Sequence, residues 1–403
     1  MNDFEISRVI KAYIACRRHK RVTGSALSFE ISAESNLVNL CEKLKNHTYQ
    51  PRDSICFAVQ YPKPREIFAG HFTDRVVHHL LVEKIENIFE SRFIYHSFAC
   101  RKKKGAHLAV KVIKKSLNKI TKNRTSPAYY GKFDIKSFFC SIDKKILFQL
   151  ISKTINNCLS KESCDEILHL AAIIIFHDPT KNYCIKGNPH LLSEIPPYKS
   201  LFGIPKGKGL AIGNLTSQFF ANVYLNELDQ YAKRTLKIKY YFRYVDDIVI
   251  LSKNREQIKY WQGKIDDFLK KRLKLQLHPK KTRCGSVYQG IEFVGQFIKP
   301  THVLFRKRTV KSFKKKLYLI NRGMIFISNN QIQKALPLSI PPSPNEIKQI
   351  RQTVNSYYGL LRHANCYNLR KNLYNKHFGI LKKYLKPVNN YSYFEIKNPP
   401  ALS

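Results

Sequence analysis

Two adjacent aspartates lie between two runs of apolar and β-branched residues, and they constrain the fold more than any other part of the sequence. The segment reads Tyr-Phe-Arg-Tyr-Val-Asp-Asp-Ile-Val-Ile-Leu from Tyr241 to Leu251. Such runs favour β-strands, so the segment predicts a tight strand–turn–strand with Asp246 and Asp247 at its tip. Two like charges at one tip raise each other's proton affinity, and a bound divalent cation would neutralise them. Taken alone, the pair is equally well interpreted as a solvated turn.

The large excess of positive charge in the chain indicates which class of molecule it binds. Lys and Arg total 71 and Asp and Glu total 28 among 403 residues, a formal net charge of +43. Positive charge of this size repels itself unless a polyanion is bound, so nucleic acid is the leading expected partner. An anionic membrane surface ranks second. Because no clear amphipathic anchor is visible, we expect no membrane partner.

Cysteine usage and the N-terminus favour a cytoplasmic protein. The ten cysteines occur singly, without a C-x-x-C pair or a Cys/His zinc spacing, which is typical of reduced thiols. The N-terminus carries early acids and lacks the apolar core of a signal peptide. The longest apolar run, Leu168 to Phe176, is broken only by His169 and is too short to cross a bilayer. We therefore predict a cytoplasmic location.

A third carboxylate is needed if the aspartate pair serves phosphoryl transfer. The two-metal route needs carboxylates that hold two cations about 4 Å apart, one for the attacking oxygen and one for the leaving group. Asp134 is the best candidate, because the stretch from Ala128 to Phe133 reads as a strand that enters it. More than a hundred residues separate Asp134 from Asp246, so only a sheet would bring them together. Taken alone, Asp134 would be interpreted as a helix N-cap.

Blocks along the chain resemble, in order and spacing, the fingers–palm core of a reverse transcriptase. Phe133-x-Asp134 resembles the first catalytic block of that family, and Tyr244-Val245-Asp246-Asp247 resembles the second. Each block is weak alone, but their order together is specific. The other blocks are Pro64–Ile67 and Ser97–Arg101 in the fingers, Gly213–Gln218 with Ala221–Leu225 at the nucleotide pocket, His278–Thr282 around a lysine, and Phe293–Gly295 at the primer grip.

One departure from the common pattern indicates a subfamily. Most reverse transcriptases carry Gln-Gly-x-x-x-Ser-Pro in the pocket block, where this chain has Ile212-Gly213-x-x-x-Ser217-Gln218. This variant resembles reverse transcriptases of diversity-generating retroelements, which copy an RNA template into cDNA with frequent errors at adenines and so rewrite a target gene. A Gln would hydrogen-bond the incoming nucleotide, whereas Ile212 can only pack, which suggests weaker discrimination. Ordinary packing of Ile212 behind the pocket is the equally weighted alternative.

The resemblance implies roles for individual residues. Asp134, Asp246 and Asp247, with the backbone carbonyl of Ile135, would hold two Mg²⁺ ions, for which Mn²⁺ could substitute. Lys281, or its neighbour Lys280, would protonate the pyrophosphate leaving group or simply contact phosphate. The residues expected to bind the nucleotide are Lys63, Arg65, Phe139 as a steric gate against a ribose 2′-hydroxyl, Ile212, Gly213 and Gln218. The residues expected to contact nucleic acid are Arg101, Lys102, Lys104, Phe293 and Gly295.

The implied fold class is α+β, a right-hand polymerase whose palm is an antiparallel sheet backed by helices. We expect an N-terminal extension and fingers over 1–130, a palm over 131–300 with a finger or loop insertion at about 145–210, and a helical thumb over 301–403. Apolar spacing predicts a helix over 72–89, and further helices are expected over 216–233 and 255–273.

The functional alternatives come from two classes. Within the polymerases, a retron, a group II-like or a phage-defence reverse transcriptase is the alternative to the diversity-generating type. In a different class, the chain would be a non-catalytic RNA-binding protein on a polymerase fold, although degeneration should remove the three aspartates first. The expected partners are a template RNA, a cDNA or primer strand, deoxynucleotides, and a small basic oligomeric accessory protein, in a prokaryotic or phage setting.

Overall fold

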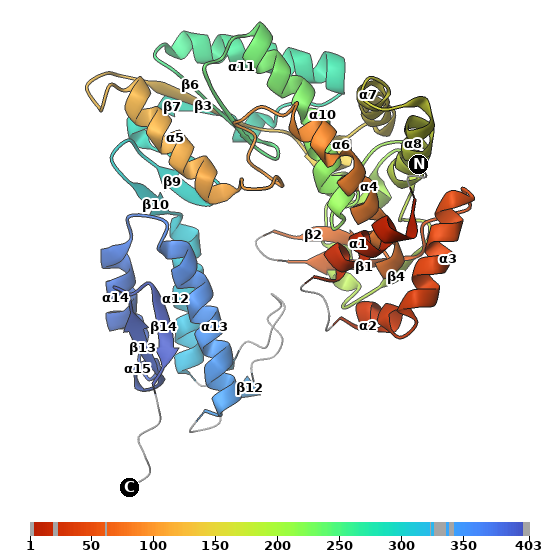
Figure 1. Ribbon diagram of the computed structural model, residues 1–403. Coiled ribbons are helices and arrows are strands. Elements are labelled where there is room, and N and C mark those ends of the chain that lie inside the picture. Colours follow the sequence, from red (N-terminus) through yellow and green to blue (C-terminus); the bar gives the residue numbers. More distant parts are fainter. Residues whose placement is uncertain are drawn as a thin grey trace. The chain divides into compact units, whose positions relative to one another are not determined.

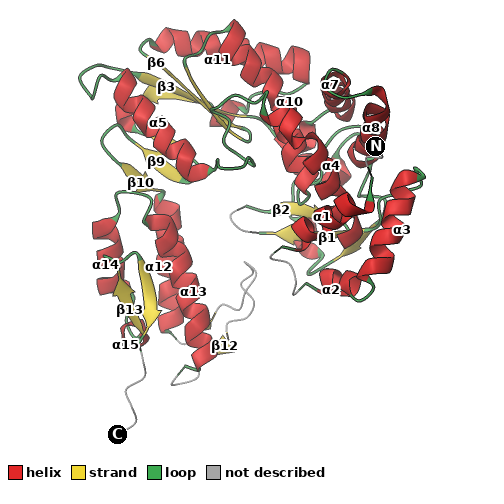
Figure 2. Ribbon diagram, in the orientation of Figure 1, coloured by secondary structure: helices red, strands yellow, loops and turns green. Residues whose placement is uncertain are grey.

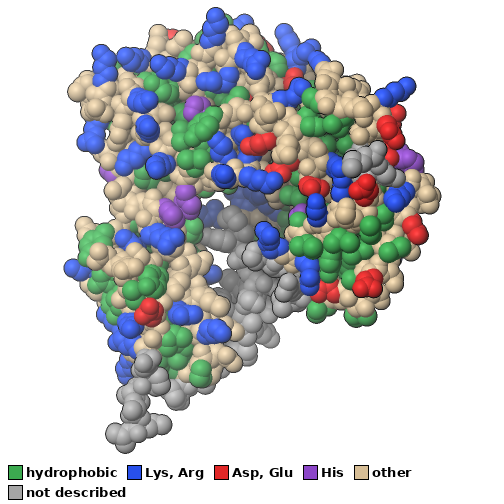
Figure 3. Space-filling view, in the orientation of Figure 1, with side chains coloured by type: hydrophobic (Ala, Val, Ile, Leu, Met, Phe, Trp, Pro, Cys, Tyr) green, Lys and Arg blue, Asp and Glu red, His purple; other side chains and the backbone are tan. Residues whose placement is uncertain are grey.

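The protein divides into two compact units in a computed structural model that describes residues 4–18, 23–60, 63–322, 324–325, 336–337 and 342–397. The first unit comprises Met1–Gly105, Gly131–Leu251 and Glu256–Cys284, and the second comprises Ala106–Tyr130, Ser252–Arg255 and Gly285–Ser403. Figure 1 traces the chain through both units. Lys and Arg side chains are spread over the visible face (Figure 3), as the net charge requires.

A four-stranded sheet positions the predicted acids. Its strand order is β5-β6-β3-β7, and Figure 2 shows these strands in yellow. The hairpin of β5 and β6 is antiparallel, with Tyr241 opposite Ile250 and Tyr244 opposite Asp247. Every residue of β6 after Asp247 is buried, which fits its unbroken apolar sequence. The strands are β3 (Tyr129–Asp134), β5 (Tyr240–Tyr244), β6 (Asp247–Ser252) and β7 (Arg283–Ser286).

Two long helices accompany this sheet. Helix α11 (Arg255–Leu273) buries Ile258, Trp261, Ile265 and Leu269, the spacing of one helical face. It packs so closely on β3 that a Cβ at Gly131 would lie 2.7 Å from Ile258 Cγ2. Helix α10 (Leu215–Gln230) is buried on most sides and continues as a π-helical turn at Tyr231–Thr235.

A second, three-stranded sheet of the first unit combines two N-terminal strands with a later one. Its order is β2-β1-β4, with β1 antiparallel to β2 and parallel to β4. Buried Glu66 ties β2 to a later loop, because its carboxylate accepts hydrogen bonds from Ser200 Oγ (2.6 Å) and the backbone N–H of Leu201 (2.9 Å). The strands are β1 (Ser54–Val59), β2 (Arg65–Ala69) and β4 (Tyr183–Ile185).

Shorter helices complete the first unit. Helices α1 and α4 pack against each other, as do α7 and α8. Asp143 caps α7 by accepting hydrogen bonds from the backbone N–H groups of Lys145 and Ile146. The helices are α1 (Ile6–Arg17), α2 (Gly24–Glu30), α3 (Ala33–Lys45), α4 (Phe72–Glu90), α6 (Phe138–Ser141), α7 (Lys144–Asn156), α8 (Lys161–Phe176), α9 (His190–Ser193), and the 3-10 turns Pro197–Lys199, Leu201–Gly203 and Pro279–Lys281.

The second unit has its own apolar core. Phe313, Leu317, Val354, Tyr358 and Phe394 all lie in it, from helices α12 and α13 and strand β14. A capping box between Ser343 and Glu346 opens α13. The elements are α5 (Ala106–Ile120), the 3-10 turn Val287–Gln289, β8 (Ile291–Phe293), β9 (Gln296–Ile298), β10 (Val303–Phe305), α12 (Lys307–Asn321), β11 (Met324–Ile325), β12 (Leu336–Pro337), α13 (Pro344–Leu361), α14 (Tyr367–His377), α15 (Leu381–Tyr384), β13 (Leu385–Val388) and β14 (Tyr393–Ile396).

The mixture of helices with antiparallel sheets confirms the predicted α+β class. The helices predicted over 72–89 and 255–273 are α4 and α11. The division into fingers, palm and thumb stays a prediction. Residues 323, 326–335, 338–341 and 398–403 of the expected thumb lie outside the described residues. Among the described residues, no helix has the length and apolar character needed to cross a membrane.

Candidate active site

The paired aspartates lie at a two-residue turn between β5 and β6. Because Tyr244 pairs with Asp247, only Val245 and Asp246 connect the strands. Val245 has a φ of +54°, in the left-handed region that a β-branched residue rarely adopts. Tight hairpin turns require such angles, usually at Gly or Asn. A valine held there indicates a turn whose conformation is imposed by its surroundings.

Asp134 joins the aspartate pair across the sheet. It ends β3, the strand next to β6, as expected for acids that only a sheet could bring together. Burial, followed by the negative charges of Asp134 and Asp247, raises the pKa of Asp246 to about 6, against an opposing effect of Lys281. The structure therefore places the three carboxylates within electrostatic reach of one another.

Two lysines already neutralise part of this negative charge. Lys281 Nζ donates a 2.6 Å hydrogen bond to Asp134 Oδ1, and Lys132 Nζ lies 3.5 Å from Asp247 Oδ1. Among the described residues, no three His, Cys, Asp or Glu side chains form a ready metal-binding group. The carboxylates nevertheless fit a divalent cation, since they are hard oxygen ligands whose mutual repulsion a cation would relieve. Ile135, the predicted carbonyl ligand, is buried and forms a β-bridge with Leu277.

The predicted nucleotide-binding cations lie close to this cluster. Burial lowers the pKa of Lys63, and the charges of Lys281, Lys199 and Arg65 lower it further, while Asp134 raises it. Arg65 begins β2 and is exposed. Several cations that repel one another in the free protein suit a triphosphate, whose charge would relieve that repulsion.

The predicted steric gate lies at the start of a short helix after Asp134. Phe139 belongs to α6 and packs against Phe138, with ring centroids 5.4 Å apart. Its carbonyl accepts a 2.8 Å hydrogen bond from the backbone N–H of Leu210. This bond ties the start of α6 to the loop that leads into Ile212, so the gate and the pocket block are structurally linked.

The pocket block runs along strand β2. The carbonyl of Ile212 accepts a 2.9 Å hydrogen bond from the backbone N–H of Phe68. Gly213 follows with a φ of +131°, and a Cβ there would lie 2.7 Å from Phe68 O, so only glycine fits without displacement. Gln218 is exposed in the first turn of α10, next to buried Ser217.

A half-buried histidine contacts the first turn of the same helix. His78 Nδ1 shares a hydrogen bond with Thr216 Oγ1, in the first turn of α10. Burial, aided by His177, His79 and Arg75, lowers the pKa of His78 to about 3. The imidazole is therefore neutral at physiological pH, and it acts as a packing and hydrogen-bonding group.

The predicted contacts to nucleic acid fall in different environments. Arg101 turns inward: it forms a two-pronged ion pair with Glu90 (2.7 and 2.9 Å) and donates to the carbonyls of Ile94 and Ser97. These bonds favour a structural role for Arg101, and the predicted template contact stays untested. Lys102 is exposed beside Glu86, and Lys104 Nζ lies 3.4 Å from the centroid of the Tyr95 ring.

The primer-grip triplet lies in the second unit. Phe293 is completely buried at the end of β8, so its ring packs in the core. Gly295 has a φ of +82°, and a Cβ there would meet nothing within 4 Å. Glycine is favoured at position 295 by the positive φ of the backbone, not by neighbouring atoms that would clash with a Cβ. A contact with the primer would come from the backbone of this turn.

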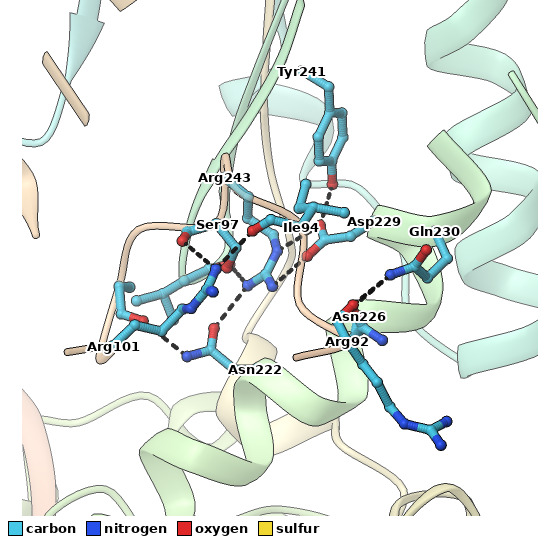
Figure 4. A network of polar contacts seen from close by, with 12 residues as sticks. Arg92, Ile94, Ser97, Arg101, Asn222, Asn226, Asp229, Gln230, Tyr241 and Arg243 are labelled. Atoms are coloured by element: carbon cyan, nitrogen blue, oxygen red, sulfur yellow. Dashed lines mark hydrogen bonds and ion pairs between the residues drawn. The ribbon is translucent and has the colours of Figure 1, made fainter. Parts of the chain in front are cut away.

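Sequence reasoning missed a buried polar network around Arg243 (Figure 4). It contacts the acidic turn, residues 244–247, through the carbonyl of Val245. Arg243 and Asp229 have fully buried side chains and form a two-pronged ion pair, with Nη2–Oδ2 at 2.6 Å and Nε–Oδ1 at 2.8 Å. Tyr241 donates to the same carboxylate, and Arg243 Nη1 donates to Asn222 Oδ1. The one available signal was an arginine inside an otherwise apolar strand.

Comparison with known proteins agrees with this geometry. The sequence profile "Reverse transcriptase (RNA-dependent DNA polymerase)" matches residues 62–298. The chain is 23% identical to the protein YkfC of Escherichia coli K12 over 302 residues, covering 66% of this chain and 70% of YkfC. It is 24% identical to the group II intron-encoded protein LtrA of Lactococcus lactis over 211 residues, covering 52% of this chain but only 30% of LtrA.

Similarity to solved structures is weaker. The apo telomerase of Candida tropicalis truncated from its C-terminal domain aligns at 13% identity with a TM-score of 0.46, over 66% of this chain and 59% of that one. At that score the alignment adds nothing to the family assignment. The profile match, which spans more than half of the chain and contains all three aspartates, is sufficient. This chain belongs to the reverse transcriptase (RNA-dependent DNA polymerase) family.

Proposed function

We propose that the protein is an RNA-directed DNA polymerase that uses Asp134, Asp246 and Asp247 as its catalytic carboxylates. The observation that carries the proposal is the convergence of these three acids on adjacent strands inside the matched reverse transcriptase region. Scarce acids in a chain of net charge +43 gather at one point, and cations surround them. A polyanionic template and primer would supply the missing negative charge over the rest of the surface.

The side chains divide the work of phosphoryl transfer. The three aspartates would hold two Mg²⁺ ions, which would activate the primer 3′-hydroxyl and stabilise the leaving pyrophosphate, with Mn²⁺ as a substitute. Lys281, now bound to Asp134, would donate a proton to the leaving oxygen. Lys63 and Arg65 would bind the triphosphate oxygens. Phe139 would exclude a ribose 2′-hydroxyl by contact.

Primer extension on an RNA template tests the polymerase proposal. Purified protein, an annealed DNA primer, deoxynucleotides and Mg²⁺ should give full-length cDNA, and Asp246→Ala should give none. A non-catalytic RNA-binding protein would bind the template equally well in both forms and extend the primer in neither. Equal extension by both forms would also refute the assigned role of Asp246.

Within this activity, we propose the diversity-generating type, with its error-prone copying at adenines. Support comes from Ile212 and Gln218 in the pocket block, where most relatives carry Gln and Pro. The proposed partners are a structured template RNA, the cDNA or primer strand, deoxynucleotides and a small basic oligomeric accessory protein. A group II-like enzyme is the second candidate, favoured by the match to LtrA.

Substitution of Ile212 tests the link between pocket and fidelity. Ile212→Gln restores a side chain that can hydrogen-bond the nucleotide, so adenine errors in sequenced cDNA should fall. Ala211→Gln places the same side chain one residue earlier and should leave the error frequency unchanged. If Ile212→Gln leaves it unchanged too, Ile212 only packs behind the pocket and is not a fidelity determinant.

A further inference from the structure

The guanidinium of Arg243 holds the acidic turn in place. Arg243 Nη1 donates a 3.1 Å hydrogen bond to the carbonyl of Val245, the residue at positive φ that precedes Asp246. The same guanidinium is bound by the Asp229 carboxylate, and both side chains have no exposed surface. One buried cation therefore joins the turn to helix α10. Figure 4 shows its contacts with Asp229 and Asn222 of that helix.

The backbone around Arg243 is fixed as well. Its N–H donates to His96 O and its carbonyl accepts from the N–H of Phe98, each at 3.0 Å. Asn222, which accepts from Arg243, donates through its own Nδ2 to Ala99 O at 2.8 Å. The distant 96–99 segment and helix α10 thus both meet strand β5 at Arg243.

The turn needs such support for two physical reasons. Val245 occupies a backbone region that its branched side chain disfavours, so the turn alone would relax to another conformation. In addition, Asp246 and Asp247 are adjacent carboxylates at the tip, with Asp134 nearby, and like charges held together disfavour this arrangement. A hydrogen bond from a charged donor to the Val245 carbonyl opposes both effects.

We propose that Arg243, held by Asp229 and Asn222, is a positioning residue that fixes the acidic turn for catalysis and couples it to helix α10. Asp229 and Asn222 lie on the helix whose first turn carries Gln218. A shift of α10 is therefore transmitted through the guanidinium to the carboxylates. The proposal rests on the polymerase function proposed above, because positioning matters only if the acids act on a substrate.

A purely structural ion pair would behave differently from a positioning pair. Removing one partner of a buried pair leaves an unpaired charge and destabilises the fold, whereas replacing both partners by apolar residues often restores stability. The double variant Arg243→Met with Asp229→Leu removes both charges and also the bond to the Val245 carbonyl. If Arg243 positions the turn, the double variant should therefore recover the stability of the wild type but not its activity.

Two conservative variants and one control accompany the double variant. Arg243→Lys keeps the charge beside Asp229, but a single ammonium cannot reproduce the guanidinium's bonds to Asp229, Asn222 and Val245. Tyr241→Phe removes only the 2.8 Å hydrogen bond to Asp229 Oδ1. Tyr49→Phe is the matched control, because Tyr49 donates a hydrogen bond of the same length, 2.8 Å, to buried Asp74, which is not a member of the Arg243 network.

The experiment measures Tm, kcat and KM for deoxynucleotide in all four variants. For Arg243→Lys we expect kcat to fall about 100-fold, as for a small misplacement of reacting groups, with KM little changed. The double variant should regain the wild-type Tm without regaining kcat. Tyr49→Phe and Tyr241→Phe should lower Tm alike, and only Tyr241→Phe should lower kcat. A double variant that regains kcat together with Tm would overturn the proposal.

Amide hydrogen exchange gives a readout that does not depend on activity. In Arg243→Lys, peptides that cover residues 244–247 should exchange faster than in the wild type, and in Tyr49→Phe they should not. If the wild type fails to extend any primer, the proposed function fails, and the exchange result still decides whether Arg243 holds the turn. Unchanged exchange at 244–247 in Arg243→Lys would overturn the positioning role itself.

Discussion

Replacing Gly213 by alanine tests how the pocket block is built. The backbone at Gly213 has a φ of +131°, and the new Cβ would lie 2.7 Å from the carbonyl oxygen of Phe68 and 2.9 Å from Ile67 Cγ2. Neither the φ value nor a backbone oxygen can be changed by moving a flexible side chain. A non-glycine residue in such a backbone region costs about 1–3 kcal/mol. With the contact to Phe68 added, we expect a total loss of about 2–4 kcal/mol.

The assay is thermal unfolding, paired with nucleotide kinetics. A loss of that size should lower Tm by about 2–5 °C in a chain of 403 residues, and the displaced Ile212–Phe68 contact should raise KM for deoxynucleotides. Gly263→Ala is the control, because Gly263 lies inside α11 and a Cβ there meets nothing within 4 Å. That substitution should stabilise the helix by about 1 kcal/mol. If Gly213→Ala melts at the same temperature as the wild type, the close approach of Gly213 to β2 is refuted.

Two further predictions concern a lysine and a histidine. Lys281→Ala should lower kcat about 100-fold through loss of a proton donor, and Lys280→Ala should leave it near the wild-type value; equal losses in single-turnover assays would refute the assignment. Burial holds the pKa of His78 at about 3, below the 6.5 of an exposed histidine, so unfolding takes up a proton between those values. Stability should therefore be unaffected by this group above pH 6.5 and fall by up to about 1.4 kcal/mol per unit as the pH drops below it. Urea midpoints should fall less steeply in His78→Gln, and parallel declines would contradict the prediction.

The sequence predicted elements whose signal is local. Helix α11 matches its predicted range because Ile258, Trp261, Ile265 and Leu269 repeat at helical spacing and no other signal competes. The adjacency of Asp134 and Asp246 was likewise expected, since both follow or flank apolar strands and a sheet is the only way to bring them together.

Partnerships between distant residues could not be predicted in this way. Nothing in the sequence says that Arg101 turns back onto Glu90, or that Arg243 reaches Asp229 on the preceding helix. Phe293 is a second example of what the sequence cannot predict. The motif identifies the residue, but it does not reveal that the ring is buried. Such pairings depend on tertiary packing, which has no fixed sequence spacing. For the same reason the roles of the individual site residues stay predictions.

The rate of single-nucleotide incorporation on an RNA template tests the central claim most directly. The comparison is between the wild type, Asp246→Asn at the tip of the turn, and Asp267→Asn, an exposed acid on α11 that serves as the matched control. We predict that Asp246→Asn lowers the rate by about three orders of magnitude, the scale on which a lost electrostatic contact acts in other active sites, while Asp267→Asn leaves it unchanged. An equal rate for all three proteins would contradict the assignment of the acidic turn as the catalytic centre.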